Sequence, residues 1–280
     1  MNTQEFIIAA LAEDIGSGDH STLASIDAKV IGTAKLIVKE AGIIAGIRIA
    51  KEVFLHLDKE AVFTAFHTDG EYLEVGTIAF TVKAKAQAIL QAERLVLNTM
   101  QRMSGIATLT HSYVEKIKNY STTILDTRKT TPLFRAFEKE AVLLGGAKNH
   151  RMGLYDMIML KDNHIDYCGG IEKAIVAANN YLKELQLQLP IEVETRSLDD
   201  VKRVVKVGGV QRIMLDNFTP QEIEAALVLI NKQFETEASG GINFDTIEAY
   251  AATGVDFISV GAVIHHATSL DLSLKAVLHE

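Results

Sequence analysis

The sequence predicts an α/β protein in two parts: an N-terminal α+β, sandwich-like domain over residues 1–108, and an incomplete, open α/β barrel of about six parallel strands over residues 109–266. Beyond Thr122, short apolar runs alternate with helical segments, which indicates parallel strands joined by right-handed helical crossovers. Six such units are too few for a closed barrel of eight. A doubly wound sheet is the alternative architecture.

The N-terminal part mixes the two periodicities. A short helix is expected over residues 4–12, strands over 30–40, 61–67 and 77–83, and a further helix over 46–57. Residues 84–118 are rich in helix formers and predict a connecting pair of helices, with Gly105 as a break or a point of close packing.

The barrel part shows both strands and helix starts. Strands are expected at 122–126, 156–160, 190–194, 211–215, 234–238 and 255–260. Helix starts are expected at Thr131-Pro132, at Ser197, where Asp200 takes the place of the usual capping Glu, and at Thr219-Pro220. The last segment, residues 267–280, reads as a C-terminal helix that packs back on the N-terminal domain.

Bulk properties narrow the class of protein. The chain has 280 residues and a net charge of −8, which argues against nucleic acid as its main partner. Its single cysteine, Cys168, cannot form an internal disulfide and has no local signature of a nucleophile, which fits a reducing compartment. The first residues lack a basic secretory signal, and charged residues interrupt every long apolar run. We therefore expect a cytoplasmic globular protein with no membrane partner.

Basic residues are concentrated in one region of this acidic chain. They form the clusters Arg128-Lys129, His150-Arg151 and Lys161, all between Leu125 and Ile165. Concentrated cations in a protein of opposite net charge indicate a local anion site, although a solvated basic surface is the plainer interpretation.

The predicted strand ends carry most of the remaining chemistry. In parallel α/β architectures the reactive groups lie at the carboxyl ends of the strands. In chain order these ends offer Asp126, Arg128, Lys129, Lys161, Asp162, Glu192, Glu194, Asp216, Asn217, Glu237, Ser239, Gly240, Gly241 and Gly261. The glycine turns expose backbone N–H groups of the kind that hold a phosphate. Cations, carboxylates and glycine turns together predict a site for an anionic, phosphorylated substrate.

Several of these residues have plainer interpretations. Asp216-Asn217 fits ordinary turn chemistry. The alternating Glu192-Val-Glu194 puts both acids on one face of a strand, and that face points either into the barrel or toward its helices. His265-His266 is better explained as a structural pair than as a metal site, because neighbouring histidines rarely bind one ion.

The order of motifs resembles one family over essentially the whole chain. The motifs are Glu13-Asp-Ile-Gly16, Gln101-Arg-Met-Ser-Gly105, Thr127-Arg-Lys-Thr-Thr-Pro132, Glu138-Lys139, Asn149-His-Arg151, Lys161-Asp-Asn-His164, Glu192-Val-Glu194, Leu215-Asp-Asn217, Glu237-Ala-Ser-Gly-Gly241 and Ile258-Ser-Val-Gly261. They are similar to those of quinolinate phosphoribosyltransferase, the decarboxylating nicotinate-nucleotide pyrophosphorylase. One departure is Leu133, where the family usually has glycine; a place in the first turn of a helix would make this loss cheap.

The resemblance implies a reaction and a site. The reaction is transfer of phosphoribosyl from phosphoribosyl pyrophosphate to quinolinate with loss of CO2, in NAD biosynthesis, by a Mg2+-dependent homodimer or higher homo-oligomer. The implied substrate-binding residues are Arg102 from the partner subunit, Arg128, Lys129, His150, Arg151, Lys161, Ser239, Gly240, Gly241 and Gly261. Lys129, Lys161, Glu194 and Asp216 are the implied catalytic residues, and Glu194 and Asp216 the implied Mg2+ ligands, directly or through water or substrate.

Three other functions remain open at this point. A related phosphoribosyltransferase would use another acceptor, although Lys161-Asp-Asn-His164 argues against the molybdenum-transport branch. A barrel aldolase would use Lys129 or Lys161 as a Schiff-base amine. A non-catalytic protein would only bind phosphoribosyl pyrophosphate. The paired acids of the commoner phosphoribosyltransferase fold are absent at a strand end, since Asp199-Asp200 opens a predicted helix instead.

Overall fold

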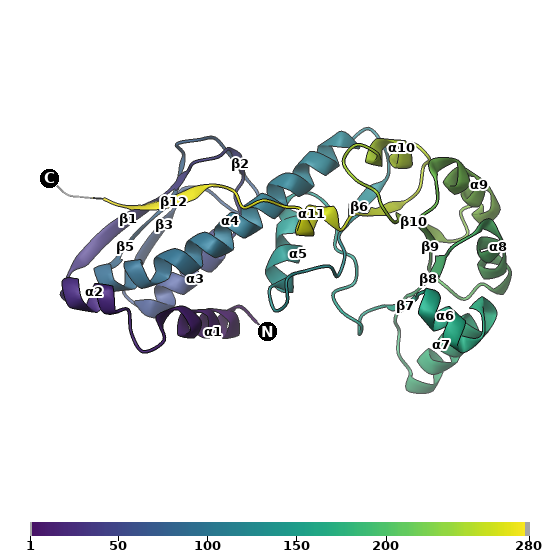
Figure 1. Cartoon of the computed structure of the whole chain (residues 1–280), viewed down its shortest axis with the longest axis horizontal. Helices are drawn as coiled ribbons and strands as arrows, with labels where there is room; N and C mark the ends of the chain where they lie inside the picture. The colour runs from purple at the N-terminus through teal and green to yellow at the C-terminus, as the bar shows by residue number, and fades with distance from the viewer. Residues whose placement is uncertain (1, 278–280) are drawn as a thin grey trace. The chain divides into compact units, whose positions relative to one another are not determined.

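The computed structural model describes residues 2–277, which form two compact units. The first unit takes up the chain to His111, the stretch Thr131–Gly146 and the chain from His266 onward; the second takes up Ser112–Thr130 and Ala147–His265. Each unit has its own sheet (Figure 1). The predicted domain limits of 1–108 and 109–266 differ from this division, mainly because Thr131–Gly146 belongs to the first unit.

The first unit is an α+β domain built on an antiparallel sheet. Its strand order is β12-β1-β5-β3, and a separate two-stranded sheet pairs β2 with β4. Buried Leu36 and Phe80 pair across β1 and β5, and Phe80 continues into a ring cluster with Phe54 and Phe63. The elements are α1 Thr3–Ile15, α2 His20–Ser25, β1 Ile31–Val38, β2 Gly42–Ile43, α3 Ile47–Leu57, β3 Val62–Ala65, β4 Tyr72–Leu73, β5 Ile78–Lys85, α5 Arg135–Leu144 and β12 Leu272–Ala276.

The predicted C-terminal helix is wrong. Within the described residues the segment forms β12, which pairs antiparallel with β1 in the register Leu36↔Leu274, while residues 278–280 of the predicted helix lie outside the described part of the chain. The reason is visible in the alternation of Leu270, Leu272 and Leu274, all buried, with polar neighbours between them. A period of two suits a half-buried strand, and pairing with β1 satisfies its backbone groups.

The predicted pair of connecting helices is a single helix, α4, which runs without interruption from Ala86 to Lys116. Gly105 lies inside it and marks close packing, not a break. A Cβ atom at this position would overlap the carbonyl oxygen of Thr268, so the chain leading into β12 packs directly on the helix backbone. Glycine in a helix costs about 1 kcal/mol relative to alanine, and here the close approach explains its presence.

The helix predicted to start at Thr131-Pro132 begins later, at Arg135, with Phe134 at its N-cap. Leu133 therefore lies before the helix, in the left-handed region with φ of 63°, and its side chain is 78% exposed. The expectation that this residue occupies a first helical turn is wrong. Positive φ is the conformation that glycine adopts without cost, so leucine strains the backbone here.

The second unit contains the predicted open barrel. Its six strands all run parallel in the order β6-β11-β10-β9-β8-β7, which confirms the number and the direction predicted from the sequence. The strands are β6 Thr123–Leu125, β7 Ile158–Leu160, β8 Ile191–Thr195, β9 Arg212–Asp216, β10 Glu235–Ser239 and β11 Phe257–Ser259.

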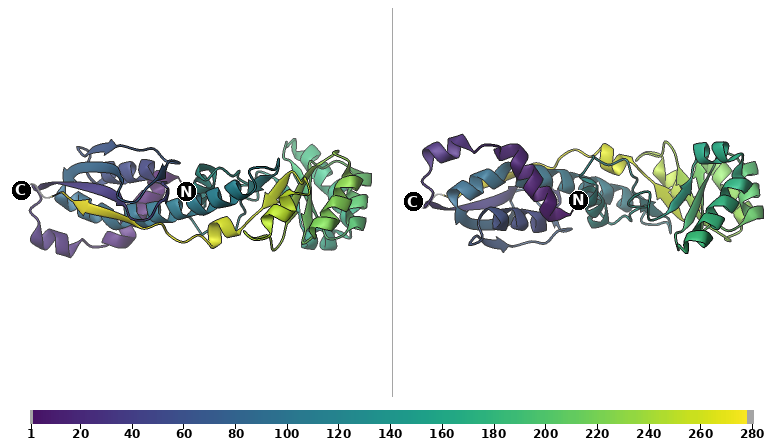
Figure 2. Two further views of the ribbon diagram at one scale, coloured as in Figure 1. Left: turned by 90° about the horizontal axis from the view of Figure 1, so that it is seen from above. Right: turned by 90° about the horizontal axis from the view of Figure 1, so that it is seen from below.

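Helices cover the outer side of this curved sheet, as the two views in Figure 2 show. They are α6 Asp162–Cys168, α7 Ile171–Leu185, α8 Leu198–Val207, α9 Pro220–Ile230 and α10 Ile247–Ala251, while the short α11 Ala262–His265 follows β11 at its carboxyl end. Two predicted helix starts are confirmed. Thr219 forms a capping box with Glu222, and Ser197 accepts the N–H of Asp200 as an N-cap.

Among residues 2–277, no helix combines the length and the apolar character that crossing a membrane would require.

Candidate active site at the carboxyl ends of the barrel strands

The strand bounds place most of the predicted site residues on one rim of the second unit. Arg128 and Lys129 follow β6, Lys161 follows β7, Glu194 lies near the end of β8, and Asp216 ends β9. The glycine turn after Ser239 follows β10, and Gly261 follows β11. Because all six strands are parallel, these residues share the carboxyl end of the sheet, where α/β folds hold their ligands.

A lysine and two carboxylates meet on this rim. The Nζ of Lys161 lies 3.8 Å from Oε2 of Glu194. Burial raises the pKa of Glu194 above its usual value, and the negative charge of Asp216 on the neighbouring strand raises it further. Two acids that disfavour each other's charge are a common feature of cation sites. Their oxygen donors suit Mg2+, so Glu194 and Asp216 fit the ion that the resemblance implies.

The turn after β10 is shaped to expose backbone N–H groups. Gly240 and Gly241 both have positive φ, of 94° and 65°. A Cβ atom on Gly240 would lie 2.9 Å from the backbone nitrogen of Asn217, so no larger residue fits there without a shift of the backbone. Asn217 also donates its N–H to the carbonyl of Ser239 at 2.8 Å, which ties the ends of β9 and β10 together. Consecutive residues of this kind form concave sites for anions.

The rim also brings together residues that follow its first and its last strand in the sequence. A Cβ atom on Gly261 would lie 3.3 Å from Cδ of Lys129, so the lysine after β6 lies beside the turn after β11. The pKa of the Arg151 guanidinium is lowered first by burial and then by the positive charge of Arg128. Cations that destabilise one another in a partly buried place are stabilised by a bound anion, which is the behaviour expected of a dicarboxylate or phosphate site.

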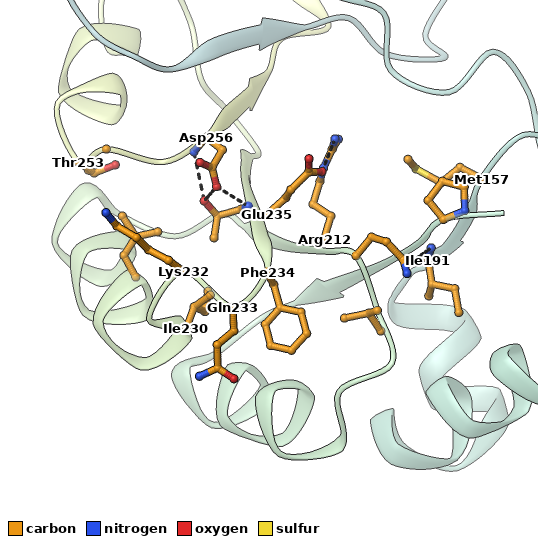
Figure 3. Close-up of a pocket in the computed structure, with 16 residues that line it drawn as sticks. Met157, Ile191, Arg212, Ile230, Lys232, Gln233, Phe234, Glu235, Thr253 and Asp256 are labelled. Atoms are coloured by element: carbon orange, nitrogen blue, oxygen red, sulfur yellow. Dashed lines mark hydrogen bonds and ion pairs between the residues drawn. The ribbon is translucent and has the colours of Figure 1, made fainter. Parts of the chain in front are cut away.

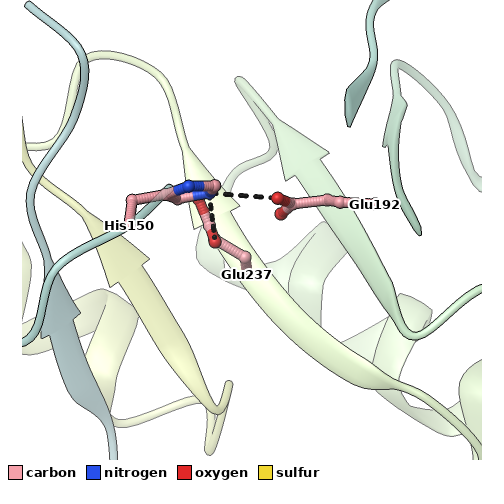
Figure 4. Close-up of side chains that lie close together, drawn as sticks. All are labelled: His150, Glu192 and Glu237. Carbon is pink, nitrogen blue, oxygen red and sulfur yellow. Dashed lines mark ion pairs between the residues drawn. The ribbon is translucent and has the colours of Figure 1, made fainter. Parts of the chain in front are cut away.

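The backbone of His150 lies beside Asp126, the residue after β6, but its ring contacts acids within the strands. Its ring is buried, and Nε2 lies 3.0 Å from Oε2 of Glu192 and 3.3 Å from Oε2 of Glu237 (Figure 4). Arg212 on β9 donates to the same Oε2 of Glu237 at 3.0 Å. These four side chains come from the loop before β7 and from β8, β9 and β10, and we call them the interior cluster.

The interior cluster shifts the pKa values of its members. Burial raises the pKa of Glu192 to about 7, and the charge of Glu237 adds to this rise. For His150, burial lowers the pKa, but hydrogen bonds to Glu192 and Glu237 outweigh it and raise the pKa to about 9. Nδ1 of His150, however, accepts the N–H of Arg151 at 2.7 Å, which only an unprotonated Nδ1 does. In both cases Nε2 carries a proton. A second proton, on Nδ1, would break the contact with the Arg151 N–H, and this cost acts against the rise in the pKa of His150.

The structure corrects the strand-end assignment of two residues. Glu192 and Glu237 lie within β8 and β10, where they are fully buried, not at the strand ends. The face shared by Glu192 and Glu194 points into the barrel, because Glu192 meets Arg212 of β9 and Glu237 of β10 there. Arg212 was not among the site residues predicted from the sequence. Its signal was a charged residue at the start of a buried strand whose neighbours also carry inward acids.

Arg102 belongs to the first unit and contacts Glu138 and Ala267 there. Its guanidinium donates to Oε1 of Glu138, with Nη2 at 2.8 Å, and to the carbonyl of Ala267 at 2.9 Å. Glu138 is fully buried, and it also accepts from the N–H and the hydroxyl of Thr131. A buried carboxylate thus holds the orientation of Arg102, which the sequence analysis placed in the site by resemblance alone.

A cavity of about 1230 Å³ opens at the opposite end of the barrel strands (Figure 3). Its walls include Met157, Pro190, Gln211, Phe234 and Asp256, each of which directly precedes a strand. Three of the charged groups there have partners within the protein: Arg212 pairs with Glu235 at 3.0 Å, and Asp256 accepts the Thr236 hydroxyl at 2.7 Å. We therefore assign the chemistry to the carboxyl ends, where cations and acids face one another, and not to this cavity.

Both units match known families of protein domains. Residues 19–104 match the quinolinate phosphoribosyl transferase N-terminal domain, and residues 106–275 match the quinolinate phosphoribosyl transferase C-terminal domain. Among curated proteins, the chain is 44% identical to the chloroplastic nicotinate-nucleotide pyrophosphorylase [carboxylating] of Oryza sativa subsp. japonica, over 95% of this chain and 75% of that protein. It is 42% identical to a probable nicotinate-nucleotide pyrophosphorylase [carboxylating] of Synechocystis, over 95% and 90%.

Solved structures agree. The crystal structure of NadC from Streptococcus pyogenes is 39% identical with a TM-score of 0.92, covering 97% of this chain and 95% of that one. The nicotinate-nucleotide pyrophosphorylase of Francisella tularensis is 38% identical with a TM-score of 0.92, over 98% and 96%. The chain therefore belongs to the quinolinate phosphoribosyltransferase family.

Proposed function

We propose that this protein is a quinolinate phosphoribosyltransferase. It transfers phosphoribosyl from phosphoribosyl pyrophosphate to quinolinate and releases nicotinate mononucleotide, CO2 and pyrophosphate, a step of NAD biosynthesis. The observation that carries the proposal is that the chain matches both domains of one family across nearly its whole length, at about 40% identity to several of its named members. The rim adds chemical support, because its cations, acids and glycine turns suit the two substrates.

Quinolinate presents two carboxylates on one flat ring, and the rim offers several cations for them. Arg128, Arg151 and Lys161 are the residues that we assign to these carboxylates, with Lys129 beside them. Guanidinium groups bind planar carboxylates through paired hydrogen bonds, which also fixes the orientation of the ring. The mutual repulsion of Arg128 and Arg151 is relieved when a dianion binds between them.

The phosphoribosyl donor is assigned to the later strand ends. Ser239, Gly240, Gly241 and Gly261 supply the turns for its phosphate, and Glu194 and Asp216 are the acids for Mg2+. When bound, Mg2+ would neutralise the charge of the departing pyrophosphate. The pyridine nitrogen attacks the anomeric carbon, which becomes positively charged in the transition state, and the Glu194 carboxylate stabilises that charge. Loss of CO2 leaves an electron pair on the ring carbon beside the pyridinium nitrogen, whose positive charge stabilises it, and that carbon then takes up a proton from water; no further cofactor is needed.

Three further parts of the proposal rest on the sequence, the first two through its resemblance to the family and the third through its composition and its first residues. The first is that the protein acts as a homodimer or higher homo-oligomer to which Arg102 contributes across a subunit boundary. Mixing inactive Arg102→Ala and Lys161→Ala proteins tests this, because shared sites regain activity when subunits exchange. The second is the direct or indirect nature of the Mg2+ contacts. The third is cytoplasmic location, since plant relatives carry names that include chloroplastic and mitochondrial forms.

An assay with quinolinate, phosphoribosyl pyrophosphate and Mg2+ tests the reaction by following nicotinate mononucleotide. We expect product with quinolinate and none with nicotinate in its place. Product from nicotinate alone would instead indicate a related phosphoribosyltransferase with another acceptor. Binding of phosphoribosyl pyrophosphate without product from either acceptor would indicate a non-catalytic protein.

A further inference from the structure

The interior cluster is connected to the rim through Arg151, and the proposed reaction does not explain this connection. Glu192 and Glu237 are fully buried charged groups, and burying a carboxylate is costly unless it has a structural or functional partner. Their nearest shared partner is the ring of His150, which lies between them (Figure 4). His150 in turn is joined to the chain on both sides of it, so the cluster holds more than one side chain in place.

Two backbone contacts pass through His150. Its own N–H donates to Oδ1 of Asp126, the residue after β6, at 2.8 Å. Its Nδ1 accepts the N–H of Arg151 at 2.7 Å. The Arg151 guanidinium then donates through Nη1 to the carbonyl of Met157 at 3.1 Å, at the entry to β7. The loop that carries Arg151 is therefore held at one end by the buried imidazole ring.

These contacts also decide between a proton and a metal ion at the centre of the cluster. The His150, Glu192 and Glu237 ligand atoms lie within 4.8 Å of one another, close enough to surround an ion. A metal-bound imidazole donates its other N–H to an acceptor, but here Nδ1 faces a donor, the N–H of Arg151. Nε2 of the ring must then carry the hydrogen. Arg212 supplies the positive charge near Glu237 that an ion would otherwise bring.

We propose that Glu192, Glu237 and His150 are positioning residues. The two carboxylates hold the imidazole ring through close charged contacts with Nε2, at 3.0 and 3.3 Å, and the ring accepts the backbone N–H of Arg151, whose guanidinium binds a carboxylate of the acceptor. The proposal rests on the proposed function and gives His150 a role behind the rim, acting through Arg151. The charged and titratable groups around His150 are Asp126 on the β6 side, Glu192 on β8, Arg212 on β9, Glu237 on β10 and Arg151 next to it.

The test compares two glutamates on β10 that contact the same arginine. Glu237 is buried against His150, whereas Glu235 is 53% exposed and pairs with Arg212 from outside the cluster. We expect Glu237→Gln to raise KM for quinolinate about tenfold, with KM for phosphoribosyl pyrophosphate and kcat changed less than twofold. The matched control, Glu235→Gln, leaves all three constants unchanged. Equal effects of the two variants would overturn the proposal.

A double-mutant cycle separates positioning from general damage to the fold. If Glu237 acts through Arg151, Glu237→Gln has no further effect on quinolinate binding, measured by calorimetry, once Arg151 is replaced by alanine. Independent, additive losses would show that the residue acts in some other way. Glu192→Gln, which keeps the side-chain size and one acceptor oxygen, provides a second variant if Glu237→Gln does not fold.

A spectroscopic arm does not depend on activity. In the substrate-free protein labelled with 15N-histidine, the His150 ring, identified by its loss in His150→Asn, should show a protonated Nε2, and Glu237→Gln should shift that signal. An unprotonated Nε2 would refute the geometry, as would a rise in melting temperature with Zn2+ or Mn2+ alone that disappears in Glu237→Gln. If the wild-type protein makes no product from quinolinate, the proposed function fails while this arm still reports on the cluster.

Discussion

The interior of the barrel and its rim use the same kinds of residues for different purposes. Glu192 and Glu194 are two positions apart on β8 and share a face. Glu192 is fully buried against His150 and Glu237, whereas Glu194 faces Lys161, whose side chain is 49% exposed, and the acid of β9. Two residues along one strand, about 7 Å, separate an acid enclosed by side chains of other strands from an acid that meets the exposed lysine of the rim.

The difference teaches how burial changes the cost of a charge. Inside the barrel every charged group needs a partner, since an unpaired buried charge costs several kcal/mol. On the rim, solvent reduces this cost, and unbalanced charges are tolerated until a substrate arrives. We therefore expect interior substitutions to change the free energy of unfolding, in addition to any effect on quinolinate binding through Arg151, and rim substitutions to change the reaction while leaving the free energy of unfolding nearly unchanged.

The largest expected effect follows from removing the interior cation. Arg212→Met leaves Glu237 buried beside Glu192 without its guanidinium, and we expect a loss of about 3–5 kcal/mol in the free energy of unfolding. Urea unfolding measures it. The matched control is Arg203→Met, which breaks an exposed ion pair with Glu172 and should cost less than about 1 kcal/mol. Similar losses in both variants would contradict the distinction between buried and exposed charges.

Stability should also depend on pH through Glu192. Its pKa is raised to about 7 in the folded protein, from an ordinary value of 4.5, so the folded state resists its ionisation. The contribution is present below about pH 4.5 and is lost as the pH rises through about 7, on the order of 3 kcal/mol. Glu192→Gln should therefore gain stability relative to the wild type across this range in urea unfolding.

The control for this pH dependence is a glutamate with the opposite shift. The pKa of Glu172 on the surface is lowered to about 2, chiefly by its hydrogen bond with Arg203, so its contribution is lost only as the pH falls toward 2. Glu172→Gln should leave the slope between pH 4.5 and 7 unchanged. Parallel curves for Glu192→Gln and the wild type in that range would show that Glu192 ionises normally.

On the rim, loss of a cation should affect the reaction and spare the fold. Arg128→Ala or Lys161→Ala is expected to lower kcat/KM for quinolinate about 100-fold, because each removes a charge that binds the substrate or stabilises the transition state. The urea midpoint should stay near that of the wild type. Lys202→Ala, on the exposed side of α8, serves as the control. Near-normal rates in a rim variant would remove that residue from the site.

The smallest expected effect is at Leu133, a residue that is neither buried nor charged. Leu133 has positive φ and an exposed side chain, so Leu133→Gly should relieve backbone strain and raise the free energy of unfolding by about 1 kcal/mol. Kinetic constants should not change. A destabilised Leu133→Gly protein would show that the exposed leucine has a packing partner under working conditions.

The sequence was sufficient wherever local pattern and topology agree. Short apolar runs between capped helices, such as those at Ser197 and Thr219, predicted the six parallel strands. Once the strands are parallel, their carboxyl ends share one edge, which places Lys161, Glu194 and Asp216 together. The C-terminal strand was missed because its alternation is short, and its state depends on a free edge of β1 more than 230 residues away in the chain.

The sequence by itself determined the α/β class, the chemical groups that follow each strand and, through its motifs, the family. Only the tertiary structure decided how deeply each charged side chain is buried. Glu192 and Glu194, or Glu235 and Glu237, are indistinguishable by residue type and alternation, and their burial depends on which side chains arrive from strands far away in the chain. Because the cost of a charge is set by those neighbours, the division between the interior cluster and the rim appears only when the strands are assembled.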